Sequence, residues 1–297
     1  MSKLKAKAPE VVPQGKTKCL IFGASGVGKT WFSLTFPRPY FIDTEGGAQL
    51  EHYRKRLTEV GGVYMGQAEG ALDFGEVIGQ IQALATEKHE YSTLIIDSIT
   101  KLYQTAIANE VERLGDKDAF GASKKPAIAG MRRLVNWIMR LDMNVIFCAH
   151  ETNEWGVNPK SGQREEIGKM SDIWDKLTYE LDLSLRVIRQ GKIYPATAIV
   201  TKSRLEGFQL GDTFPLEYAE YATRYGFDAI ERATAPITLA SAKQIAEIER
   251  LVELLKVSEA ETEKILNRAR ADSWKELSEE QAEKTIKYFN AKIKGEK

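Results

Sequence analysis

The sequence has little cysteine and no excess of either charge. Its 297 residues include two cysteines, Cys19 and Cys148, and both lie in apolar stretches that are typical of buried strands. We therefore expect reduced core thiols in a reducing compartment, not a disulfide framework. Lys and Arg together number 42, as do Asp and Glu, so the net charge is zero. Bulk charge thus gives no argument for nucleic-acid binding, which would need a local patch.

Long apolar runs are also missing. No segment is apolar over the roughly 20 residues that a membrane-spanning helix needs. Residues 1–15 contain Lys3, Lys5 and Lys7 but no apolar block like that of a secretory signal. We therefore expect a short flexible arm there, no membrane partner, and a cytoplasmic protein.

One glycine-rich stretch carries the strongest functional signal. It follows the pattern Gly, four residues, then Gly-Lys-Thr, and comprises Gly23, Ala24, Ser25, Gly26, Val27, Gly28, Lys29 and Thr30. An apolar run precedes it and a short helical stretch follows it, as a phosphate-binding loop requires. The backbone N–H groups of such a loop point at phosphate oxygens. Lys29 would reach the β- and γ-phosphates, and Thr30 would hold Mg²⁺, so the stretch predicts nucleoside triphosphate binding.

Short apolar runs alternate with amphipathic stretches through residues 16–204. This alternation predicts an α/β fold with a mainly parallel central sheet flanked by helices. Strands are expected at residues 18–22, 40–42, 63–65, 92–97 and 144–150, and a hairpin at 181–188 and 194–201. Helices are expected at residues 73–88, capped by Asp73, and at 99–114 and 127–141. The polar segment 151–171 is expected to form a long mobile loop, because it lacks apolar periodicity.

The expected secondary structure changes near residue 234, from alternating strands and helices to helices alone. Three helices are expected after this point, each with a capping box at its start: Ser241 with Gln244, Ser258 with Glu261, and Ser278 with Gln281. The organisation we predict is an arm at residues 1–15, an ATPase domain at 16–233 and a three-helix module at 234–297.

Three side chains at expected strand ends indicate which reaction the bound nucleotide could undergo. Asp97 ends a buried strand, where an acid can reach the Mg²⁺ held by Thr30, or can instead cap the next helix. Glu45 follows the second strand and could polarise a water for attack on the γ-phosphate, although it could also be a turn former, and Asp43 is a competitor for this role. His150 ends another strand, where it could contact the γ-phosphate or be structural.

Two further groups of side chains could contact nucleic acid. The segment after His150 combines one aromatic residue with basic and amide groups, a combination that suits a stacked base and a tracked backbone. Its candidates are Asn153, Trp155, Asn158, Lys160, Arg164 and Lys169. Nearby glutamates offset this charge, so a merely solvated loop is the alternative. Lys124 and Lys125, in the loop expected before Pro126, form a second candidate.

The order of these motifs resembles the ATPase core of the RecA family. The sequence runs from the phosphate-binding loop through Phe-Ile-Asp-Thr-Glu-Gly-Gly, Leu-Ile-Ile-Asp-Ser and Ala-His-Glu to Lys-Ser-Arg, over residues 16–204. It looks closest to the short, phage-encoded RecA-core proteins that act in single-strand annealing recombination.

This resemblance implies ATP as the nucleotide, an oligomeric ring or filament, and roles for individual residues. Glu45 would activate the attacking water, and His150 would sense the γ-phosphate. Tyr53 would stack on adenine, and residues 151–171 would form a DNA-binding loop. Lys202 and Arg204 would act on the ATP of a neighbouring subunit, although from the residues alone they could be solvated cations at a hairpin edge. The strand before His150 is expected between the strands that end at the phosphate-binding loop and at Asp97.

The function most in keeping with these features is an oligomeric, DNA-stimulated ATPase that binds single-stranded DNA and promotes annealing or recombination. Alternatives are a hexameric helicase-like motor and an ATP-switched adaptor. In the adaptor, the C-terminal helices would recruit a single-strand-binding protein or a helicase. A P-loop kinase is less favoured, because it would need an Arg-rich lid over the phosphates, and residues 156–168 contain only one arginine, Arg164.

Overall fold

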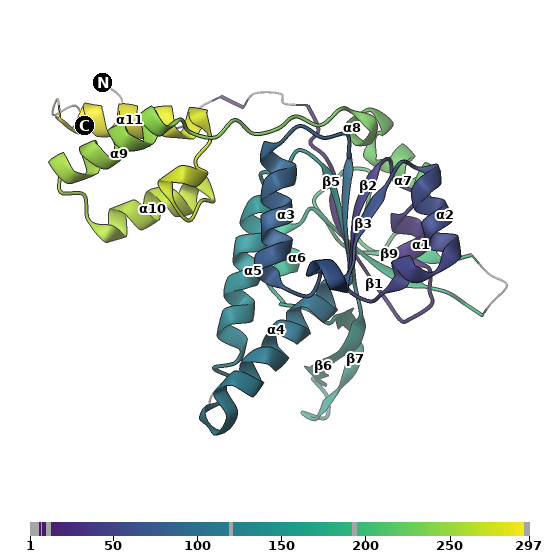
Figure 1. The fold of residues 1–297 in the computed structure, drawn as a ribbon. Coiled ribbons are helices and arrows are strands. Elements are labelled where there is room, and N and C mark those ends of the chain that lie inside the picture. Colours follow the sequence, from purple (N-terminus) through teal and green to yellow (C-terminus); the bar gives the residue numbers. More distant parts are fainter. Residues whose placement is uncertain (1–5, 7, 10–12, 119–120, 192–194, 294–297) are drawn as a thin grey trace.

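The computed structural model describes residues 6, 8–9, 13–118, 121–191 and 195–293 (Figure 1). Much of the arm expected at residues 1–15, and Tyr194 of the expected hairpin, lie outside the described residues. In the described part of the chain, no helix is both long and apolar enough to cross a membrane.

A mainly parallel sheet forms the centre of the molecule, as the sequence predicts. In the described residues it has eight strands in the order β10-β9-β8-β1-β5-β4-β2-β3. The strands are β1 (Lys18–Phe22), β2 (Pro39–Asp43), β3 (Val63–Met65), β4 (Thr93–Asp97), β5 (Asn144–Ala149), β8 (Leu183–Ile188), β9 (Thr197–Ser203) and β10 (Thr213–Pro215). The pairs from β8 through β3 are parallel, and β9 pairs antiparallel with both β8 and β10.

The register of the central strands decides where the candidate site lies. Strand β5 is between β1 and β4, as the RecA resemblance implies, and every residue of these three strands is buried. Phe22 is opposite Ala149, and Asp97 is opposite Cys148. The carboxyl ends of the three strands therefore meet at one edge of the sheet.

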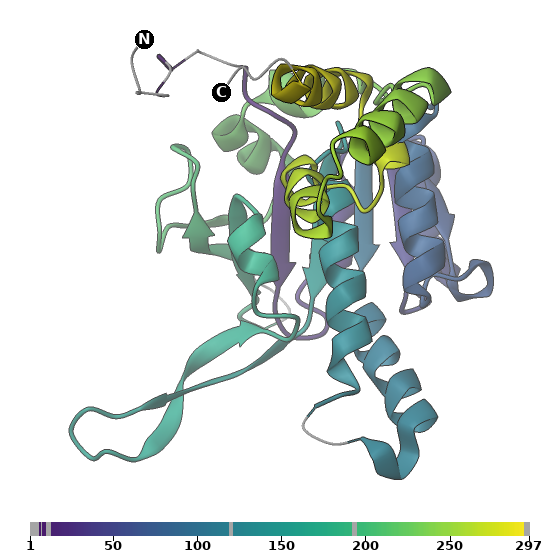
Figure 2. The same cartoon turned by 90° about the vertical axis from the view of Figure 1, so that its left-hand side faces the viewer.

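Helices cover both faces of the sheet (Figures 1 and 2). One face packs against α3 (Phe74–Thr86), α4 (Ile99–Leu114), α5 (Lys124–Ile138) and α6 (Leu177–Glu180). The other packs against α1 (Lys29–Ser33), α2 (Glu51–Glu59), α7 (Tyr218–Tyr225) and α8 (Phe227–Glu231). Successive residues of β1 supply the two cores in turn, Leu20 to the first and Ile21 to the second. Cys19 and Cys148 are free and buried, as predicted.

Two sequence predictions about helix starts differ in outcome. Asp73 caps α3 as predicted, because its carboxylate accepts the Glu76 N–H at 3.0 Å. Helix α5, in contrast, begins at Lys124, so Lys124 and Lys125 belong to its first turn and not to the preceding loop. Pro126 does not delay the helix, because a proline within the first turn needs no N–H partner.

The largest error of the sequence analysis concerns residues 151–171. They do not form an irregular loop but a paired antiparallel ribbon of β6 (Glu151–Val157) and β7 (Arg164–Ser171). The ribbon projects away from the body of the molecule (Figure 2). Neither of its faces is buried against the core, so the apolar alternation that normally identifies a strand is absent.

The C-terminal helices are α9 (Ala242–Leu254), α10 (Glu259–Ala269) and α11 (Glu279–Ile293), and they have a core of their own around Leu251 and Phe289. The expected capping boxes form at Ser241 and Ser278. At α10, Ser258 caps the helix, but the Glu261 carboxylate instead accepts hydrogen bonds from α11.

These helices lie at the opposite end of the sheet from the ribbon (Figure 1). Glu276 connects them to the domain that contains the sheet, since its carboxylate is 3.1 Å from Arg133 on α5 and its carbonyl accepts from Arg140 at 2.5 Å.

Candidate nucleotide-binding site

The glycine-rich loop joins β1 to α1 at the carboxyl edge of the sheet, and its glycines are required by geometry. Gly26 and Gly28 have φ angles of 77° and 105°, which side chains with a Cβ rarely adopt. At Gly23 the constraint is contact, because a Cβ there would lie 2.3 Å from the carbonyl oxygen of Val187 on β8. Val27 contributes its side chain to the core.

Lys29 is held at the rim of this loop. Its ammonium donates to the carbonyl oxygens of Gly23 and Ala24, each at 2.8 Å, and the residue is buried. A cation positioned over the loop in this way faces the space that phosphate oxygens would occupy.

Thr30 and Asp97, predicted as a metal pair, are in direct contact. The Thr30 hydroxyl donates to Asp97 Oδ2 at 2.5 Å. Burial raises the pKa of Asp97 to about 6, against the opposing effect of the Thr30 hydrogen bond. The alternative role of Asp97, capping α4, is filled by Ser98, whose hydroxyl accepts the Lys101 N–H at 3.2 Å.

Asp43 and Glu45, the two candidates for the general base, have different environments in the structure. Asp43 is buried, and its carboxylate accepts backbone N–H groups from four successive residues at 2.7–3.2 Å: Glu45, Gly46, Gly47 and Ala48. Such a carboxylate shapes the turn after β2 and has its acceptor positions occupied. Glu45, in contrast, projects from this turn with a side chain that is 40% exposed.

Glu45 is instead part of a cluster with Ser98 and His150. Its Oε1 accepts the Ser98 hydroxyl at 2.6 Å and lies 2.5 Å from His150 Nε2. Burial alone would raise the pKa of Glu45, but the hydrogen bonds from Ser98 and His150 outweigh it, and the pKa is lowered. The carboxylate is therefore ionised at neutral pH.

These side chains surround one cleft of about 610 Å³, a volume that suits a nucleotide-sized ligand. The cleft brings together the predicted residues Lys29, Thr30, Glu45, Asp97 and His150.

Tyr53 also lines the cleft, where burial and the charge of Asp97 raise its pKa. Its ring is 4.1 Å from that of His52 and 6.4 Å from that of Trp31. Trp31, His52 and Arg189 are lining residues that the sequence analysis missed. Trp31 directly follows the loop motif and could have been found, whereas only tertiary packing brings Arg189 to the cleft.

Lys202 and Arg204 do not reach this cleft. Ser203 is opposite Leu183, which in turn is opposite Cys19 near the start of β1, so the pair lies at the amino-terminal edge of the sheet. Lys202 donates to the Leu181 carbonyl, and Arg204 donates to the Tyr179 carbonyl at 2.6 Å.

The ribbon carries the residues predicted to contact DNA. Trp155 is 52% exposed, and the Arg164 guanidinium lies 5.9 Å from its ring centroid. Lys169 is partly neutralised, since it pairs with Glu166 at 2.7 Å and donates to Asn153. Lys160 lies in the exposed turn between the two strands.

A phosphate-binding loop between the first strand and the first helix, with an acid at the end of a nearby strand, defines a P-loop nucleotide-binding protein. Residues 15–205 match the family described as the AAA domain, and the chain belongs to this family. The family match thus supports an ATPase domain over these residues.

No curated protein matches the chain significantly. Among solved structures, the chain is similar to one described as the RadB recombinase, at 16% sequence identity. The alignment covers 66% of this chain and 86% of that chain, with a TM-score of 0.41.

Proposed function

We propose that this protein binds ATP with Mg²⁺, hydrolyses it with Glu45 as the base, and uses the cycle as an oligomer that binds single-stranded DNA and promotes annealing or recombination. The observation that carries the proposal is the Glu45–Ser98–His150 cluster, which faces the phosphate-binding loop and continues directly into the ribbon.

The residues of the cleft fit the nucleotide and its metal. Lys29 and the loop N–H groups would bind the β- and γ-phosphates, and Thr30 with Asp97 would hold Mg²⁺. When bound, Mg²⁺ supplies positive charge to the phosphate oxygens. Asp97, whose pKa is raised to about 6, remains largely ionised at neutral pH and so is available as a ligand.

Glu45 is positioned to orient and deprotonate the attacking water. Its carboxylate is held by Ser98 and His150, so one oxygen has a fixed direction while the side chain stays accessible from the cleft. A base fixed in this way lowers the barrier by positioning as well as by proton transfer.

The edge at which Lys202 and Arg204 lie supports their action on a neighbouring subunit. In a head-to-tail assembly, the amino-terminal edge of one subunit can face the carboxyl edge of the next, and such contacts close into rings or continue as filaments. Fixed cations beside the γ-phosphate would stabilise the charge that develops during hydrolysis. Hydrolysis would then depend on assembly.

A helicase-like motor or an ATP-switched adaptor remains the second candidate, favoured by the separate C-terminal helical core. The ATPase rate with and without single-stranded DNA, measured together with particle mass, separates these functions. Annealing of complementary strands without duplex unwinding supports the first proposal, whereas ATP-driven unwinding supports the motor.

Replacing Lys29 by alanine should strongly weaken nucleotide binding, because it removes the ammonium that the Gly23 and Ala24 carbonyls hold at the phosphate-binding loop. We expect ATP affinity to fall by more than about tenfold, measured by titration calorimetry. The exposed Lys88→Ala is the matched control and should bind normally. Unchanged affinity in Lys29→Ala would remove the central premise.

Replacing Trp155 or Arg164 by alanine should weaken binding of single-stranded DNA by about five- to a hundredfold, the range for loss of one stacked base. Fluorescence anisotropy with an oligothymidine in the presence of ATP measures this loss. Tyr179→Ala removes another exposed aromatic residue, which lies outside the ribbon, and serves as the control. Binding should also weaken steeply with salt. An absence of affinity in wild-type protein at low salt would contradict the DNA proposal.

A further inference from the structure

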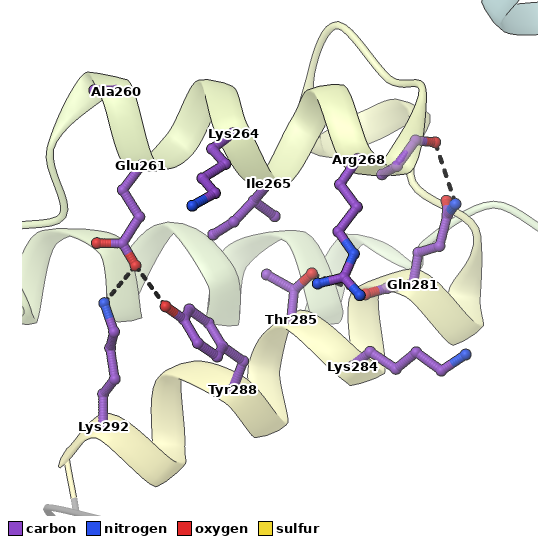
Figure 3. Close-up of a pocket in the computed structure, with 11 residues that line it drawn as sticks. Ala260, Glu261, Lys264, Ile265, Arg268, Gln281, Lys284, Thr285, Tyr288 and Lys292 are labelled. Atoms are coloured by element: carbon purple, nitrogen blue, oxygen red, sulfur yellow. Dashed lines mark hydrogen bonds and ion pairs between the residues drawn. The ribbon is translucent and has the colours of Figure 1, made fainter. Parts of the chain in front are cut away.

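A groove separates α10 from α11 in the C-terminal helices (Figure 3). Its lining shares no residue with the lining of the nucleotide cleft. Helix α11 packs on α9 through the shared core, but α10 is connected to α11 mainly at its two ends. At one end Glu261 accepts from Tyr288 at 2.9 Å and from Lys292, and at the other Gln281 donates to the Ala269 carbonyl at 3.2 Å. Between these ties lies a hollow of about 1040 Å³.

The groove has an apolar floor and a basic rim. Ile265 and the methyl group of Thr285 lie between the two helices, while Lys264 and Arg268 extend from α10 across the opening (Figure 3). Ile265 is only partly buried, so its side chain is available to a ligand.

The charges of the lining do not balance. Four cations, Lys264, Arg268, Lys284 and Lys292, accompany one carboxylate, Glu261. Lys292 is paired with Glu261, and Lys284 with Glu280 outside the lining. Within the described residues, Lys264 and Arg268 have no carboxylate at ion-pair distance. The groove therefore presents two uncompensated positive charges beside an apolar surface.

We propose that this groove binds an acidic peptide segment of a partner protein, with one or two bulky apolar side chains between its carboxylates. The ties at residues 261 and 269 of α10 are about 12 Å apart at 1.5 Å per residue, which spans three or four residues of extended peptide. An apolar side chain would rest on Ile265, and the flanking carboxylates would pair with Lys264 and Arg268.

Nucleic acid suits the groove less well. Binding to a phosphate backbone needs a run of cations along the strand, but here Glu261 and Glu280 neutralise the cations at both ends of α11. An apolar floor also gives phosphate groups no favourable contact.

The test uses the full-length protein and a fluorescein-labelled decapeptide in which eight Asp and Glu residues flank a central Phe-Leu pair. We expect saturable binding by anisotropy that weakens with salt. The double variant Lys264→Glu with Arg268→Glu should weaken binding by at least about tenfold. Lys243→Glu with Lys275→Glu reverses two exposed charges of the same helical unit outside the groove, and should change affinity by less than about twofold.

A second arm tests the apolar contact. A peptide with Gly-Gly in place of Phe-Leu should bind about tenfold more weakly, and Ile265→Ser should reduce affinity only for the Phe-Leu peptide. Thermal melting by circular dichroism checks that each variant is folded. The ATPase rate should be unchanged in the charge variants, so the result is independent of the nucleotide cleft.

Equal peptide affinity in wild type and Lys264→Glu/Arg268→Glu would overturn the proposal. So would equal weakening by the control pair. Displacement of the peptide by a single-stranded oligonucleotide that binds the charge-reversed variant poorly would assign the groove to nucleic acid instead. Self-association that is lost in the charge-reversed variant, without peptide binding, would assign it to a second copy of this chain.

Discussion

Replacing Glu45 by glutamine should leave ATP binding intact and slow hydrolysis by at least about a hundredfold, the lower range for loss of a positioned base. The amide cannot accept a proton, yet it has nearly the same shape and can still accept the Ser98 hydrogen bond. Titration calorimetry should therefore give near wild-type affinity for ATP, while the steady-state rate of phosphate release should fall by at least about a hundredfold. This split between binding and turnover is the signature of an interaction made in the transition state.

A matched control for this experiment is Glu51→Gln, which removes an exposed carboxylate from the first turn of α2. It should hydrolyse ATP at the wild-type rate. Near wild-type turnover in Glu45→Gln would show that another group acts as the base. Asp43 is a poor substitute, because four backbone N–H groups occupy its carboxylate.

Mixing two inactive variants should restore activity if Arg204 acts across a subunit interface. Arg204→Ala alone should lower the rate by at least about a hundredfold, as loss of a transition-state arginine does. In an equal mixture with Glu45→Gln, an interface works when an intact Glu45 site meets an intact Arg204. About one quarter of head-to-tail interfaces satisfy this condition if subunits mix at random. Phosphate release by the mixture should approach that fraction of the wild-type rate.

The control for mixing is Glu45→Gln combined with Lys29→Ala, because both changes disable the same cleft and no pairing of these subunits can restore it. Each protein must also assemble as wild type does, which light scattering can measure. A mixture of Glu45→Gln and Arg204→Ala that stays as inactive as its components, despite mixed assembly, would argue against action in trans. Arg204 would then be a structural residue that holds the Tyr179 carbonyl.

Local sequence signals predicted most of the core. The phosphate-binding loop, the buried strands and the caps at Asp73, Ser241 and Ser278 depend on residues within a few positions of one another. Such features can be read from the sequence because backbone geometry and nearest neighbours determine them. The proximity of Thr30 and Asp97 was also predictable, since parallel strands end at a common edge.

Features that depend on register or on the absence of burial were not predictable in the same way. The ribbon was missed because an exposed strand pair has no apolar alternation to detect. The different roles of Asp43 and Glu45 depend on the turn after β2, whose backbone N–H groups donate to the Asp43 carboxylate and leave Glu45 exposed. Lys202 and Arg204 lie at the far edge of the sheet because β9 runs antiparallel to β8, and β8 runs parallel to β1. Local sequence signals did not show that β8 pairs with β1.

The junction between β5 and β6 has a mechanical consequence. Only His150 separates the buried strand from the ribbon, whose base is fixed by a 3.0 Å Glu151–Arg186 ion pair and by the Asp172 N–H bonded to the His150 carbonyl at 2.9 Å. Strand β6 has 7 residues and so is about 23 Å long at 3.3 Å per residue. A tilt of about 5° at His150 would therefore move the tip by about 2 Å. Under the proposed function, a small displacement of His150 in the cleft would therefore be amplified at the tip of the ribbon, next to the residues proposed to contact DNA.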